Sequence, residues 1–155
     1  TLLPGVEIWS DRWDESARHF VLLDGQGAIA GAFRFHLLES LTQGPDVEVW
    51  GGRGAGLPKP MAYSSRMFVA PSHQGLGLSR ILDRLGIEMP RDAGAACVVA
   101  TTGSVEANRT RIDYMTRLGW TCLGPGEKAA GSPYYAAFPA SVFVIGFTTS
   151  ESDAS

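Results

Sequence analysis

The first half of the chain consists of apolar runs separated by short polar breaks. The runs HFVLLD (residues 19–24) and AIAGAFRFHLL (28–38) flank the sequence GQG. Two runs rich in branched and aromatic residues on either side of a glycine turn predict a β-hairpin. A third run, MAYSSRMFVA (61–70), ends at Pro71 and predicts another strand. The chain is therefore expected to open with a meander of antiparallel strands.

Between the second and third runs, residues 39–60 are dense in glycine and proline. Neither residue type suits the interior of a helix or of a central strand. A long loop is therefore expected here. Long loops in compact domains often carry binding functions, so we expect this loop to face the substrate.

A helical spacing of apolar residues begins at Leu76. These residues fall on one face of a helix and predict a helix packed against a core. Pro90 is expected to kink or end this helix, and the sequence RDAG that follows should close it. The apolar positions of the predicted face are Leu78, Ile81, Leu82, Leu85 and Met89.

The rest of the chain predicts one more helix and three strands. AACVVAT (95–101) is a continuous apolar run that suits a strand buried on both faces. A second helix is expected over Val105–Leu118, and the runs WTCLGP (120–125) and SVFVIGF (141–147) predict two strands. The order of elements is strand, strand, strand, helix, strand, helix, strand, strand. This order indicates an α/β (α+β) fold with a mixed sheet.

Composition limits the class of protein. The chain has 155 residues, 45% of them hydrophobic and 19% charged, which suits one globular domain with its own core. A net charge of −3 gives no reason to expect a nucleic-acid partner. No apolar run is long enough to span a bilayer, and no signal peptide opens the sequence. We therefore expect no membrane partner and a cytoplasmic location.

Cysteines and histidines give no sign of a metal site. Cys97 and Cys122 both lie in apolar, strand-like runs, and we expect two reduced thiols in the core. The three histidines, at positions 19, 36 and 73, are scattered and lack the spacing of metal ligands. No metal is predicted.

The stretch VAPSHQGLGLSR (69–80) links a predicted strand to a predicted helix through two glycines. A P-loop is excluded because no lysine occurs between Lys59 and Lys128. A dinucleotide fingerprint fits poorly because Arg80 stands where its third glycine belongs. The pattern that remains is Gln-x-x-Gly-x-Ser. Backbone N–H groups at a helix N-terminus bind anions, and glycines let a pyrophosphate approach.

This pattern resembles the acyl-CoA signature of the GNAT N-acetyltransferase superfamily. The later sequences VVAT and RLGW, with Asn108 between them, follow in the order that the family shows, and the resemblance covers residues 19–147. It implies a GNAT-like mixed, mostly antiparallel sheet flanked by helices, with acetyl-CoA or another acyl-CoA as co-substrate. The residues that the resemblance places at the coenzyme are Phe68, Val69, Gln74, Gly75, Leu76, Gly77, Leu78, Ser79 and Asn108.

The resemblance departs from the family at its usual general acid. A tyrosine that often protonates the departing thiolate aligns with Met115, and Tyr114 is its neighbour. Tyr114 could reach the thiolate only if the helix were rotated or bulged. Tyr63 and His73 are further candidates for acid–base catalysis, and Glu39 and Glu48 are candidate bases beside them.

The first half is more particularly similar to the acyl-homoserine-lactone synthases and related N-acyl amino acid synthases. This branch is implied by five short motifs in register: Asp11-x-x-Asp14, Gly31-x-x-Arg34, Ser65-Arg66, VATT (99–102) and Gly119-Trp120. The resemblance implies that Asp11, Asp14, Arg34 and Arg66 form a charged cluster beside the amine substrate. It also implies a single GNAT-like acyltransferase domain over residues 1–155 that lacks the helices usually preceding the Asp-x-x-Asp motif.

The residues themselves leave the role of this cluster open. Arg34 and Arg66 lie inside apolar strand runs, and a buried guanidinium needs a carboxylate or phosphate partner. Asp11 or Asp14 would serve, either in a structural salt bridge or in a substrate site; the two aspartates could equally form a solvated turn. Tyr63 replaces the glutamate that this branch carries.

Three functions are compatible with these residues. The first is transfer of an acetyl or longer acyl group from acyl-CoA to a small amine by direct attack. The second is autoinducer synthesis, in which an acyl-homoserine lactone is made from S-adenosylmethionine and an acyl donor. The third is a module that binds CoA or a metabolite without turnover. Each takes a small-molecule partner, and either a monomer or a homodimer is compatible with the sequence.

Overall fold

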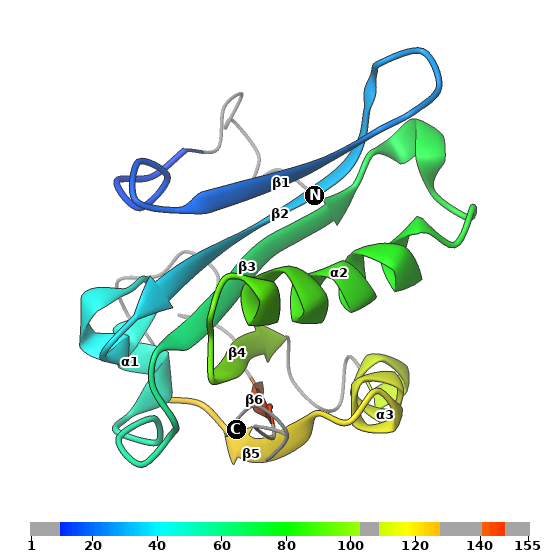
Figure 1. The fold of residues 1–155 in the computed structure, drawn as a ribbon. Helices are drawn as coiled ribbons and strands as arrows, with labels where there is room; N and C mark the ends of the chain where they lie inside the picture. Colours follow the sequence, from blue (N-terminus) through cyan, green and yellow to red (C-terminus); the bar gives the residue numbers. More distant parts are fainter. Residues whose placement is uncertain (1–9, 103–108, 128–140, 148–155) are drawn as a thin grey trace, which may run out of the picture.

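The computed structural model describes residues 10–102, 109–127 and 141–147, and these residues build one six-stranded sheet with helices against it (Figure 1). The strands are β1 (Arg18–Leu23), β2 (Ile29–Leu38), β3 (Met61–Val69), β4 (Cys97–Thr102), β5 (Thr121–Pro125) and β6 (Ser141–Gly146). The helices are α1 (Val47–Trp50), α2 (Leu78–Asp92) and α3 (Arg109–Arg117), with 3-10 turns η1 (Leu41–Gln43) and η2 (Pro71–His73).

The sheet has the order β1-β2-β3-β4-β6-β5. All neighbouring strands are antiparallel except β3 and β4, which run parallel and are joined through α2. A parallel pair needs such a crossover, whereas antiparallel pairs can be joined by turns. The predicted mixed, mostly antiparallel sheet is confirmed, and so is the predicted order of elements, apart from η1, α1 and η2.

The hydrophobic core has two parts, one on each face of the sheet. Alternation along β4 sends Val98 to one face and Cys97 and Val99 to the other. On the first face, Leu82 of α2 and Met115 of α3 pack with Val98. The second face is covered by η1 and α1 instead. Its buried cluster is Leu38, Leu41, Val49, Trp50, Met61, Tyr63, Cys97 and Val99.

The segment 39–60 is more ordered than its glycine and proline content predicts. Ser40 caps η1 with a capping box, and Val47–Trp50 forms one turn of α-helix. The prediction of a segment without helix was wrong here, because Leu41, Val49 and Trp50 are buried in the core and hold the backbone down. Glycine at position 51 closes α1 in the left-handed region, with φ of 51°.

Helix α2 continues past Pro90 to Asp92, so Pro90 does not end the helix. The helix closes two residues later, where Gly94 has φ of 98° and the N–H of Ala95 donates to the carbonyl of Pro90. Its most buried positions are Leu82, Asp83, Gly86 and Pro90. The predicted face is confirmed at Leu82, which is buried, and at Leu85 and Met89, which pack against the core, but Ile81 is exposed.

The two cysteines differ in environment. Cys97 is buried, its Sγ lies 3.3 Å from the carbonyl oxygen of Pro58, and burial raises the pKa of the thiol to about 11. Cys122 is exposed, so the prediction of two core thiols was wrong for this residue. It lies on β5, at the end of the strand order.

In the described parts of the chain, no helix is long and apolar enough to cross a membrane.

Candidate active site

The glycine turn before α2 forms an open cradle at the helix N-terminus. Gly75 and Gly77 have φ of 78° and 79°, a region that L side chains rarely adopt. A Cβ atom at either position would meet nothing within 4 Å, and Gln74, Leu76 and Ser79 are exposed. The first N–H groups of an α-helix lack partners within the helix and carry partial positive charge. The turn therefore fits the pyrophosphate of a coenzyme.

A β-bulge interrupts β3 a few residues before this turn. Arg34 pairs with Ser65 and Ala32 pairs with Phe68, so Arg66 and Met67 together face one residue of β2. Arg66 has φ of 53°, which is uncommon for a residue other than glycine. The bulge changes the direction of β3 at the middle of the sheet.

Beyond the bulge, β3 separates from β4. The two strands pair only from Met61–Cys97 to Ser64–Ala100, and Figure 1 shows them separating toward their carboxyl ends. Phe68, near the end of β3, is half exposed. Along residues 67–69, β3 has no pairing to the described residues of β4, which leaves space in the ladder for a ligand inserted between the strands.

A charged network ties the segment before β1 to the sheet. The guanidinium of Arg34 donates to both carboxylate oxygens of Asp11, at 2.8 and 3.0 Å, and also to Asp14. Arg66 donates to Asp11 at 2.7 Å. Only 3% of Arg34 is exposed, whereas Asp11, Asp14 and Arg66 are partly exposed. The predicted carboxylate partners of the two arginines are thus found, and their role toward a substrate stays a prediction.

The network sets the charge state of Asp11. Burial raises the pKa of this carboxyl, but a hydrogen bond and charge attraction from Arg34, the N–H of Trp13 and the charge of Arg66 together outweigh it. The pKa is lowered to about 2. Asp11 is therefore ionised at neutral pH and holds Arg34 in place.

His36 is a buried residue that the sequence analysis did not single out. It is 2% exposed, and its Nε2 lies 2.9 Å from the carbonyl oxygen of Trp13. That oxygen can only accept, so Nε2 carries the proton of the neutral ring. Burial lowers the pKa of His36, and Nδ1 has no hydrogen-bond partner among the described residues. A lone histidine in an apolar run carries no sequence signal for this environment.

Tyr63 lies at the centre of the face that α1 covers. It is 1% exposed, packs edge-on against Trp50, and donates its hydroxyl proton to Oδ2 of Asp46 at 2.6 Å. Thr101 Oγ1 lies 3.4 Å from the same hydroxyl. Asp46 was not predicted from the sequence as a site residue. Its only signal was an aspartate just before a short apolar run, which is typical of a helix cap, yet its side chain makes no cap hydrogen bond.

The other candidates for acid–base catalysis lie elsewhere. His73 has both ring nitrogens within hydrogen-bond distance of a side chain, Ser72 at 2.8 Å and Asp24 at 3.0 Å, and links η2 to the β1–β2 turn. Glu39 and Glu48 are exposed. None of these contacts assigns a catalytic role, which remains a prediction for His73.

The helix α3 keeps Met115, not Tyr114, in the core. Met115 is buried, and Tyr114 lies beside Arg111, whose Cζ is 5.9 Å from the centre of the tyrosine ring. Arg111 also pairs with Asp83 through two bonds of 2.5 Å, a link between α3 and α2 that the sequence did not predict. Asn108, predicted at the coenzyme, lies outside the described residues.

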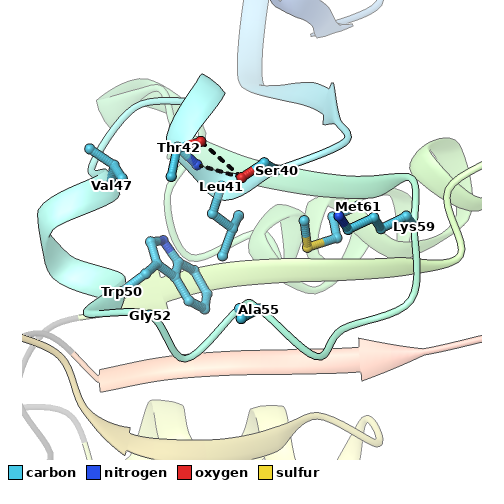
Figure 2. Close-up of a pocket in the computed structure, with 10 residues that line it drawn as sticks. Ser40, Leu41, Thr42, Val47, Trp50, Gly52, Ala55, Lys59 and Met61 are labelled. Carbon is cyan, nitrogen blue, oxygen red and sulfur yellow. Dashed lines mark hydrogen bonds between the residues drawn. The ribbon is translucent and has the colours of Figure 1, made fainter.

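A small pocket lies beside the start of β3, between this strand and the segment 39–60. Figure 2 shows Leu41, Trp50 and Met61 around it, and its volume is about 120 Å³. The indole N–H of Trp50 is buried and has no hydrogen-bond partner within the described part of the chain. The pocket is too small for a coenzyme and could hold only a small apolar group.

In the described residues, no group of three or more His, Cys, Asp or Glu side chains could hold a metal ion.

Taken together, the mixed sheet, the bulged and separating central strands and the glycine turn at the N-terminus of α2 define the fold of an N-acyltransferase. The model of the Acetyltransferase (GNAT) family matches residues 3–120. The chain belongs to this family. No curated protein matches it.

Solved structures show the same fold. Nourseothricin acetyltransferase is 22% identical, with a TM-score of 0.58, and the match covers 86% of this chain and 66% of that one. Spermidine/spermine N-acetyltransferase SpeG from Vibrio cholerae is 16% identical, with a TM-score of 0.59 and the same coverage. The CoA-dependent acyl-homoserine lactone synthase MesI is 21% identical, with a TM-score of 0.61, over 95% of this chain and 71% of MesI. The chain thus spans about two thirds of the length of the first two structures.

Proposed function

We propose that this protein is an N-acyltransferase that moves an acetyl or longer acyl group from acyl-CoA to a small amine. One observation carries the proposal: the open glycine cradle at the N-terminus of α2 directly follows a bulged strand that separates from its neighbour. In a member of the GNAT family, this arrangement supports a site for an extended anionic thioester. The proposed acyl donor therefore has stronger support than the proposed amine acceptor.

The donor is proposed to lie along the end of β3. Backbone N–H groups from Gly75 to Ser79 would hold the pyrophosphate, because the helix N-terminus and the two left-handed glycines leave them accessible, whereas the N–H of Gln74 donates to the carbonyl of Pro71. The thioester carbonyl would accept a hydrogen bond from the backbone of Met67–Val69, where the pairing with β4 has ended.

The reaction itself is a direct transfer. The ammonium of the acceptor loses a proton to a base or to water, and the amine nitrogen then attacks the thioester carbon. The new C–N bond forms as the C–S bond breaks, and the thiolate takes up the second proton of the amine. Tyr63, Tyr114 and His73 are the proposed candidates for these proton transfers. Asp11, Asp14 and Arg66 are partly exposed, so their network is a candidate wall of the acceptor site.

A lactone synthase is the second candidate. The ion pairs of Asp11 with Arg34 and Arg66 favour it, because these residues belong to the motifs that resemble that branch. The glycine turn does not argue against it, since MesI is described as CoA-dependent. At 21% identity, that likeness shows the fold alone.

Release of free thiol separates these functions. The protein would be incubated with acetyl-CoA and with longer acyl-CoAs, each against amino acids, spermidine and S-adenosylmethionine, and the products identified by mass spectrometry. Amine-dependent thiol release with an N-acyl product supports the proposal. Lactone formation from S-adenosylmethionine would favour the second candidate, and CoA binding without release with any amine would indicate a module without turnover.

A further inference from the structure

The carboxylate of Asp46 reaches from the segment before α1 onto the centre of the sheet. Its Oδ2 accepts the hydroxyl proton of Tyr63 at 2.6 Å, and Thr101 of β4 lies 3.4 Å from that hydroxyl. Asp46 is partly exposed, whereas Tyr63 is buried. A ligand can therefore contact the carboxylate while Tyr63 fixes its position.

This carboxylate lies where β3 and β4 separate. Ser64 and Ala100 form the last pair between the two strands, and Thr101 is the next residue of β4. The hydroxyl of Tyr63, one residue before Ser64, contacts Thr101 at this point. The Asp46–Tyr63 pair is thus at the beginning of the gap into which the thioester is proposed to insert.

The pair also lies on the opposite face of the sheet from α2. Tyr63 belongs to the core cluster that α1 covers, while Leu82 of α2 belongs to the cluster on the other face. A donor held at the N-terminus of α2 and an acceptor held at Asp46 would therefore approach the gap from different faces. In this arrangement the two substrates would not compete for the same face of the sheet.

The carboxylate of Asp46 differs in its charge environment from the other carboxylates described above. Among the described residues, no arginine, lysine or histidine forms an ion pair with Asp46, in contrast to Asp11, Asp24 and Asp83. A partly buried carboxylate without a counter-ion attracts a cation more strongly than one in water, because the local dielectric constant is lower.

We propose that Asp46, positioned by Tyr63, binds the ammonium group of a cationic primary amine, which is the acceptor of the acyl group. The inference rests on the proposed function and names the class of its acceptor. It makes Asp46 a substrate-binding residue and Tyr63 its positioning residue. An amine that is cationic at neutral pH is preferred over a neutral one.

The test is steady-state kinetics of thiol release from acetyl-CoA with spermidine as the probe. Asp46→Asn keeps the shape and tolerates the left-handed backbone of this residue, for which φ is 58°, but removes the charge. Loss of a hydrogen bond between charged groups is expected to raise KM for spermidine about 10- to 100-fold, with a much smaller change in kcat. Tyr63→Phe should raise KM less, because the carboxylate stays charged.

Asp92→Asn is the matched control, because it removes a negative charge from an exposed residue at the end of α2. It should leave KM unchanged, and calorimetry should give the same CoA affinity for all variants. An unchanged KM in Asp46→Asn overturns the inference and leaves the proposed function standing. A wild-type protein that binds CoA and uses only neutral amines also overturns it, whereas loss of CoA binding in wild type would contradict the proposed function itself.

Discussion

The guanidinium of Arg34 holds the carboxylate of Asp11 through both of its terminal nitrogens, at 2.8 and 3.0 Å. Arg34 is buried in β2, and Asp11 lies seven residues before β1 begins, at Arg18. A buried guanidinium without a carboxylate would be costly, so this pair fixes the N-terminal segment on the sheet. Arg66 at the bulge donates to the same carboxylate, which connects that segment to the strand proposed to hold the donor.

Replacement of Asp11 is expected to destabilise the fold. Asp11→Asn should lower the free energy of unfolding by about 2 kcal/mol, because Arg34 keeps only part of its negative partners. Urea unfolding at pH 7 measures this change. The control is Glu15→Gln, an exposed residue close in sequence. Equal, small effects of both substitutions would contradict the structural role of the pair.

The same pair predicts an acid-sensitive stability. The pKa of Asp11 is lowered from 3.8 to about 2, so the unfolded chain takes up a proton before the folded one does. The contribution of Asp11 is complete above pH 3.8 and is lost as the pH falls toward 2. The free energy of unfolding should therefore fall more steeply between pH 5 and pH 2 for wild type than for Asp11→Asn. Parallel curves would refute this assignment.

The burial of His36 predicts a second pH dependence of the free energy of unfolding, closer to neutral pH. Burial lowers the pKa of this ring below its usual 6.5, so protons bind the unfolded chain first. Stability from a neutral His36 is complete above pH 6.5 and decreases as the pH falls through that value. His36→Gln should flatten the change in unfolding free energy between pH 7.5 and pH 5. His19→Gln, at an exposed position, is the control and should leave this change as it is in wild type. If both substitutions flatten the change equally, His36 is not the source of the pH dependence.

The link between α2 and α3 can be tested in the same way. Asp83 is 5% exposed and bonds Arg111 through both oxygens, at 2.5 Å each. Asp83→Asn should cost about 2 to 3 kcal/mol in unfolding free energy, because the buried half of an ion pair is removed. Asp113→Asn, on the exposed side of α3, should cost little. If Asp83→Asn has the same free energy of unfolding as wild type, the ion pair makes no net contribution to stability.

Local patterns were sufficient to predict most of the sheet. The run 61–70 predicts β3 because apolar residues continue to Pro71, and the buried Arg34 predicts a carboxylate partner because an unpaired buried charge is unfavourable. Cys122 was misplaced, because exposure depends on the position of β5 in the strand order, which a local apolar run does not encode.

The missed site residues depend on contacts distant in sequence. Asp46 meets Tyr63 only because the segment 39–60 folds back over the sheet, and burial of Trp50 drives that folding. Asp83 meets Arg111 only once α2 and α3 lie on the same face. Neither pair has a spacing that marks it in the sequence, so each becomes visible only when the fold is known.

Calorimetric titration with CoA tests the central claim, that the glycine turn before α2 holds the donor. Gly77→Asp would fill the cradle and place a negative charge against the phosphates, so CoA affinity should fall by about 100-fold or more. Gly94→Asp is the matched control. It has similar backbone strain, with φ of 98° against 79°, and equally open space, but lies at the other end of α2. We predict normal affinity for wild type and Gly94→Asp and lost binding for Gly77→Asp; equal affinity in all three proteins would contradict the account.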